Sequence, residues 1–126
     1  MYLESRYDEA EMLCATGRAY TTPDDLVNFV YLDMLEGGIC AWRGRHDEAE
    51  DRLRRAVTLA DTTDFYWLLG TSRVRLAEAL ALAGRTVEAA ETAADGLRHY
   101  DAKGDVSTGG PARERLSSLG IEVGGA

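Results

Sequence analysis

The sequence contains two similar short stretches, Gly44-Arg45-His46-Asp47-Glu48-Ala49 and, forty residues later, Gly84-Arg85-Thr86-Val87-Glu88-Ala89. A glycine readily adopts the left-handed conformation that ends a helix, and acidic side chains stabilise the first turn of the helix that follows. A third copy, Arg6-Tyr7-Asp8-Glu9-Ala10-Glu11, matches Arg45–Glu50 at an offset of 39 residues. This self-similarity predicts stacked pairs of antiparallel helices.

Signals for helix ends divide the chain into six expected helices. Thr22-Pro23-Asp24 is typical of a helix start, with a capping hydroxyl, a proline at the first helical position and an acid in the first turn. Thr63-Asp64 and Pro111 are read as starts of the same kind, and Gly120-Ile121 as a helix stop. No alternating run predicts a strand. The expected helices are 6–20, 23–43, 46–62, 64–83, 86–103 and 111–119.

The repeated segments resemble the inter-helix turn and second helix of a tetratricopeptide repeat. The family's G-[DR]-[YH]-[DE]-E-A run is matched at Gly44–Ala49 and in part at Gly84–Ala89, and its later small position falls on Ala56 and Gly96. The repeat is roughly 40 residues long rather than about 34. That length resembles the C-terminal repeats of bacterial signalling ATPases, nucleotide-cyclase fusions and ATP-dependent transcription regulators.

Two positions depart from the family pattern. The tryptophan position of the first helix carries Asp33 in one copy and Arg73 in the other, and the leucine position carries Glu36 in the first copy. We expect Asp33 and Glu36, three residues apart on one helix face, to form a solvated or partner-facing acidic patch rather than a metal or glycosidase site.

The resemblance implies an all-α fold of antiparallel helical-hairpin repeats, forming a short right-handed α-solenoid of about five to six helices. About two and a half repeats would occupy residues 1–104, and residues 105–126 would form a capping helix and a flexible tail. Arg6–Tyr20 would be the second helix of a repeat whose first helix is absent apart from a stub at Met1–Ser5. Because such a hairpin cannot bury its apolar face alone, we expect an upstream part of a longer array or self-association to cover this open end.

Composition indicates one soluble domain with a real core. The chain has 126 residues, 45% of them hydrophobic, and a net charge of −8, which argues against nucleic acid as a direct partner. No window approaches the roughly 18 apolar residues of a membrane span, and the first residues do not read as a signal peptide. We therefore expect a cytoplasmic protein without a membrane partner. The arginines of 43–55 are expected to neutralise acids on their own helix face.

No pattern in the chain predicts catalysis, a metal site or a cofactor. The Cys and His residues, Cys14, Cys40, His46 and His99, match no zinc spacing, and no glycine-rich phosphate loop is present. Cys40 is expected to be a small core residue. We therefore expect a protein that is not an enzyme.

The candidate site is the concave groove that the family's register assigns to the first helix of each repeat. Its large or charged members are Tyr31, Met34, Leu35, Trp42, Arg75, Glu78 and Leu82. An apolar stripe of this kind marks either a partner site or ordinary core, and Phe65–Leu69 is expected to fill the core between repeats. The leading hypothesis is an interaction or regulatory scaffold that binds a peptide, a helix or another domain of its parent protein. The alternative is a structural end-cap of a larger signalling ATPase or regulator, with no ligand of its own.

Overall fold

The computed structural model describes the backbone of residues 2–122 and the side chains of residues 5–122. These residues form six helices and no strand, which confirms the all-α prediction. The helices are α1 (Tyr2–Tyr20), α2 (Leu26–Trp42), α3 (His46–Ala60), α4 (Tyr66–Leu82), α5 (Thr86–Ala102) and α6 (Val106–Ser118). The expected tail at 124–126 lies outside the described residues, as does Met1 of the expected stub.

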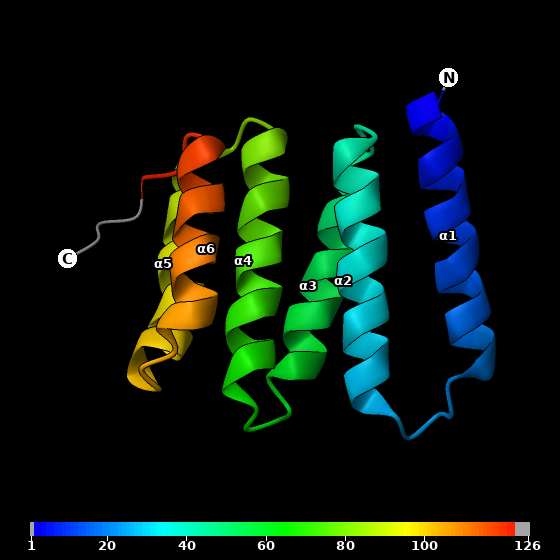
Figure 1. Cartoon of the computed structure of the whole chain (residues 1–126), viewed down its shortest axis with the longest axis horizontal. Helices are drawn as coiled ribbons and strands as arrows, with labels where there is room; N and C mark the ends of the chain where they lie inside the picture. Colours follow the sequence, from blue (N-terminus) through cyan, green and yellow to red (C-terminus); the bar gives the residue numbers. More distant parts are fainter. Residues whose placement is uncertain (1, 123–126) are drawn as a thin grey trace.

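The helices follow one another along a double row, and the chain reverses direction at each connection (Figure 1). Helices α2, α4 and α6 form the layer nearer the viewer, with α3 and α5 behind them. The most extensive contacts join α4 to α5 and α2 to α3, while α1 packs chiefly on α2. Helices α1 and α6 therefore occupy opposite ends of the row.

The glycines of the repeated stretch end α2 and α4 as the sequence predicts. Gly44 and Gly84 have φ of 82° and 85°, a backbone conformation that residues with a Cβ rarely adopt. At the first turn the amide of Gly44 donates to the carbonyl of Ala41, and the amide of Arg45 donates to the carbonyl of Cys40 at 2.9 Å. This bond pair is the Schellman motif, and the same pattern recurs at the other helix ends that carry a positive-φ glycine, Gly84, Gly104 and Gly120.

Two helices begin later than predicted. Helix α2 starts at Leu26 rather than at Pro23, because Asp25 is the capping residue and its carboxylate accepts from the amide of Asn28. Helix α4 starts at Tyr66 rather than at Asp64. Thr63 instead accepts the amide of Phe65 with its hydroxyl and holds the preceding turn.

Helices α1 and α6 begin earlier than predicted. Helix α1 starts at Tyr2 and runs without a break through the segment expected to be a separate stub. Helix α6 starts at Val106, so Pro111 lies inside it and not at its beginning. The cause is Asp105, whose carboxylate accepts from the amide of Thr108 and starts the helix before the proline is reached. The carbonyl that loses its helical donor to Pro111 belongs to Ser107, an exposed residue.

Buried positions repeat at the same forty-residue offset as the sequence motif. In the two copies the following pairs are both buried: Met34 and Val74, Gly37 and Ala77, Cys40 and Leu80, Ala49 and Ala89, Leu53 and Ala93, Ala56 and Gly96. Small residues let α4 and α5 approach closely, since a Cβ built on Gly96 would lie 2.9 Å from the carbonyl oxygen of Gly70. Cys40 is a core residue, as expected.

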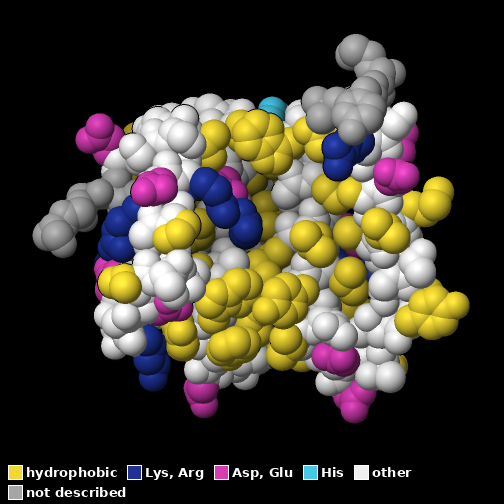
Figure 2. Space-filling view, in the orientation of Figure 1, with side chains coloured by type: hydrophobic (Ala, Val, Ile, Leu, Met, Phe, Trp, Pro, Cys, Tyr) yellow, Lys and Arg dark blue, Asp and Glu magenta, His cyan; other side chains and the backbone are white. Residues whose placement is uncertain are grey.

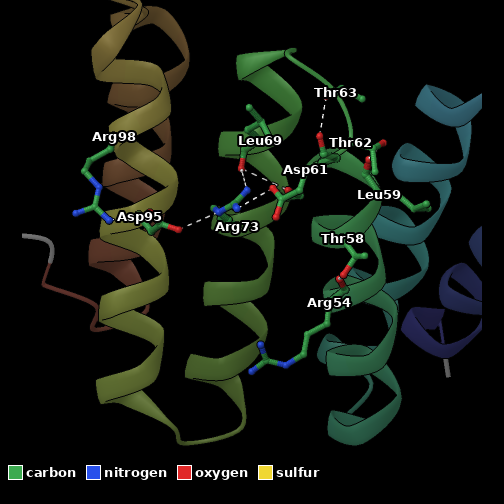
Figure 3. Close-up of polar contacts among 12 residues, drawn as sticks. Arg54, Thr58, Leu59, Asp61, Thr62, Thr63, Leu69, Arg73, Asp95 and Arg98 are labelled. Carbon is green, nitrogen blue, oxygen red and sulfur yellow. Dashed lines mark hydrogen bonds and ion pairs between the residues drawn. The ribbon is translucent and has the colours of Figure 1, made fainter.

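Arg73 cross-links neighbouring helices. Arg73 on α4 reaches Asp61 after α3 at 2.7 Å and Asp95 on α5 at 2.9 Å (Figure 3). Asp95 also pairs with Arg98 on its own helix. Because the side chain of Arg73 is largely buried, these bonds join three helices in a partly desolvated place.

Candidate functional site

All seven predicted groove residues line one cavity on the face formed by α2 and α4. The cavity has a volume of about 450 Å³. Its lining includes Tyr31, Met34, Leu35 and Trp42 from α2, and Arg75, Glu78 and Leu82 from α4. On this face hydrophobic side chains gather between the two helices, with basic side chains beside them (Figure 2). The structure thus brings the predicted residues together, while their binding of a partner stays a prediction.

The walls of the cavity are mostly apolar and partly aromatic. The rings of Tyr31 and Trp67 pack at a centroid distance of 5.5 Å and are tilted by 35°. Trp42 is 58% exposed, and Leu35 is exposed to the same degree, although both are large and apolar. Met34 is buried and belongs to the core as well as to the lining. The stripe was predicted to be either a partner site or ordinary core. One part of it is core and the other part is exposed surface.

The cavity has one charged end. Glu78 is almost fully buried; Arg75 lies 3.2 Å from its Oε2 atom and Arg115 of α6 lies 2.5 Å from its Oε1 atom. Beyond this cluster a second hollow of about 300 Å³ continues past Trp42 to Leu119. In the described part of the chain Glu78 is the only acidic partner of either arginine, so two guanidinium groups share one carboxylate.

The sequence did not indicate two aromatic residues of the lining. Tyr7 reaches the cavity from α1, and the guanidinium carbon of Arg43 lies 5.7 Å from its ring centroid. Trp67 was expected to fill the core, together with its neighbours. Leu68 is buried there, and Tyr66, Trp67 and Leu69 pack against the core, but Trp67 also lines the cavity and Phe65 is exposed. Helical spacing could have revealed Trp67, because it lies four residues before Thr71 and eight before Arg75 on the same stripe.

The expected acidic patch is not solvated. Asp33 is fully buried, and its Oδ1 atom lies 2.5 Å from the guanidinium of Arg18 on α1. Arg52 of α3 pairs with Glu36 at 2.9 Å, and Arg55 approaches Asp33 at 3.4 Å. The prediction failed because the neutralising arginines come from two other helices. The same bonds correct the expectation that the α3 arginines pair within their own helix, although Glu50 and Arg54 do so at 2.7 Å.

The two thiols lie in the core and are held in the protonated form. Burial, aided by the bond from Cys40 Sγ to Glu48 Oε2 at 3.1 Å, raises the pKa of the Cys40 thiol to about 11. Burial also raises the pKa of Cys14. Neither thiol has the low pKa that a nucleophile needs at neutral pH. Among the residues with described positions, no three His, Cys, Asp or Glu side chains gather as a metal site would require.

Comparisons with protein-family models, curated proteins and solved structures return no match for this chain. Within residues 2–122 no helix combines the length and the apolar character needed to cross a membrane.

Proposed function

We propose that the chain is a non-catalytic protein-interaction module, built of tetratricopeptide-like helical hairpins stacked into a short right-handed solenoid. Its partner is a helix, a peptide or another domain that occupies the cavity between α2 and α4, hereafter the groove. The observation that carries this proposal is the groove itself, a concave and largely apolar surface with exposed aromatic side chains.

The repeat architecture is supported by two features that share one period. The Schellman turns at Gly44 and Gly84 lie forty residues apart, and the buried positions of α2 and α3 match those of α4 and α5 at the same spacing. Stacked hairpins of this kind bury one side of each helix pair against the next and leave the first helices to line one face.

The groove has the composition of a binding surface. Trp42, Leu35 and Tyr31 expose apolar area on one contiguous patch, and such patches on a folded surface mark interaction sites. Tryptophan, tyrosine and arginine are the residue types that most often dominate binding energy, and the groove contains all three.

A groove-blocking variant tests the proposal without disturbing the core. Gly38 lines the groove, and a Cβ built on it meets no atom within 4 Å, so Gly38→Phe starts a side chain from an open position of the groove. Asp51→Phe, at an exposed position of α3, adds the same ring on the opposite layer and is the matched control.

The assay is selection of displayed peptides on the immobilised chain, followed by titration of the selected peptides. Both tryptophans of the chain line the groove, so their fluorescence reports its occupancy. We expect the peptides to bind Asp51→Phe as they bind the unmodified chain, and Gly38→Phe at least about tenfold more weakly. Peptides that bind all three proteins equally, or a selection that yields none, would contradict the proposal.

A second candidate function, a structural end-cap, is favoured by the outer side of α6. Most of its exposed residues are polar or small, among them Ser107, Gly110, Glu114 and Ser117. A polar outer face is what the last unit of a helical stack requires. This role and groove binding are compatible, because α6 contributes only Arg115 and its neighbours to the charged end of the groove.

A further inference from the structure

We propose that the groove of one copy of this chain receives α1 of a second copy, so that the protein assembles head to tail. The inference rests on the proposed function and names the partner for the same groove. It is drawn from the chemistry that the groove demands of any occupant and from α1, a helix of this chain that meets the demand.

The occupant of the groove is a helix and not an extended strand. An extended peptide needs partners for its backbone amides and carbonyls, and each one buried without a partner is costly. The groove is walled mainly by the side chains of Tyr31, Met34, Leu35 and Leu82, and the hydroxyl of Thr71 is already bonded to Tyr100. A helix satisfies its own backbone and presents only side chains.

The charged end of the groove calls for an acidic group on that helix. Arg75 and Arg115 share the single carboxylate of Glu78, which leaves one positive charge without a partner among the described residues. An occupant that places a carboxylate beside this pair completes the charge balance in a partly desolvated site, where such bonds are stronger than in water.

Helix α1 presents a matching stripe on the side that faces away from α2. Met12, Leu13 and Tyr20 are 69%, 72% and 85% exposed. Glu9, also exposed, lies one turn before Leu13 on the same stripe. Hydrophobic side chains project from the α1 edge of the molecule (Figure 2). One helix thus combines the apolar anchors and the carboxylate that the groove requires.

The inner side of α1 is held against the rest of the chain by ion pairs, so the exposed stripe lies on a helix that is already ordered. Arg18 bonds Asp33 and Glu36 of α2, each at 2.5 Å, while Arg43 bonds Asp8 and Glu11 of α1, each at 3.0 Å. A helix that is already ordered loses less conformational freedom on docking than a free peptide. The donor surface and the acceptor groove are different surfaces of one chain, so the contact is heterologous and propagates into a chain or closes into a ring.

The test uses one variant for each surface. Leu13→Glu combined with Tyr20→Glu disables the donor stripe, and Gly38→Phe blocks the acceptor groove. The controls are Val87→Glu, which charges an equally exposed apolar position on α5, and Asp51→Phe. All of these positions are exposed or face open space, and circular dichroism verifies that each variant keeps its helices.

Sedimentation velocity from about 1 to 200 µM measures assembly, a range that covers micromolar dissociation constants. We expect the unmodified chain and both controls to self-associate, and each surface variant alone to associate at least about tenfold more weakly. An equal mixture of the two surface variants should form a 1:1 heterodimer and nothing larger, because it contains one intact donor and one intact acceptor.

Several outcomes would overturn the inference. One is a monomeric unmodified chain at the highest concentration; another is self-association that survives Gly38→Phe, which indicates contact between α1 stripes. An equal mixture of the two surface variants that stays monomeric would also overturn the inference. Peptides that bind the groove while the chain remains monomeric would refute self-assembly alone and leave the proposed function standing.

Discussion

Gly37 and Gly38 are adjacent in α2, and the same substitution to alanine should change stability in opposite directions. An alanine inside a helix is more favourable than a glycine by about 0.5–1 kcal/mol, so both variants have the same intrinsic gain. At Gly38 the new methyl group meets no atom within 4 Å. Gly38→Ala should therefore raise the free energy of unfolding by about 0.5–1 kcal/mol.

The methyl group at Gly37 has no room. A Cβ at this position would lie 2.5 Å from Cγ of Leu53 and about 3 Å from both of its Cδ atoms, whereas carbon atoms in contact are about 3.5–4 Å apart. Leu53 is fully buried, so either its side chain leaves its place or α3 moves away from α2. Overpacking of this kind costs about 1–3 kcal/mol. After the intrinsic gain is subtracted, Gly37→Ala should lower stability by about 0–2.5 kcal/mol.

Urea denaturation followed by circular dichroism at 222 nm measures both variants against the unmodified chain. The difference between the two alanine variants is the more secure quantity, about 1–3 kcal/mol, because the intrinsic helix gain cancels. A Gly37→Ala protein as stable as Gly38→Ala would refute the close approach of α2 and α3. A destabilised Gly38→Ala protein would refute the open position of Gly38 on the groove and, with it, the design of the groove-blocking variant.

Three further predictions concern buried or bonded polar groups. Tyr100→Phe should cost about 1–2 kcal/mol in urea denaturation, because it leaves the buried hydroxyl of Thr71 without its partner, and adding Thr71→Val should recover part of that loss. The bonds that Asp105 accepts from Thr108 and from the hydroxyl of Tyr66 hold its pKa at about 2, below the unfolded value near 3.9. This carboxylate therefore stabilises the fold above about pH 4 and loses that effect as the pH falls towards about 2, so Asp105→Asn should flatten the fall in unfolding free energy across this window. An acid profile in Asp105→Asn as steep as that of the unmodified chain would contradict the assignment. The raised pKa of Cys40 predicts that iodoacetamide modifies it far more slowly at pH 8 than it modifies a thiol in the urea-unfolded chain, as mass spectrometry can measure; equal rates would contradict its burial.

The groove could be predicted from the sequence only in part. The seven predicted residues of α2 and α4 follow from helical spacing, and all of them line the cavity. Tyr7 and Arg115 could not be assigned in this way, since they come from α1 and α6 and reach the groove only through the packing of those helices.

Helix ends show where local signals suffice and where they do not. The stops at Gly44, Gly84 and Gly120 are local, because a left-handed residue that closes a helix has to be one that tolerates positive φ. The start of a helix is harder to predict, because several neighbouring side chains can each accept a free amide of the first helical turn. At the second helix the one that does so is Asp25 rather than Thr22.

By itself the sequence determined that this chain is helical, where its helices stop and which positions share a forty-residue period, since each of these depends on neighbours within a few turns. Only the tertiary structure decided that Asp33 is buried, because arginines of α1 and α3 surround it. Only the tertiary structure made the stripe of Tyr31 and Trp42 a groove and not a core, because that depends on which helices stand beside α2. Burial and charge pairing are properties of distant segments brought together, and a pattern along one chain does not contain them.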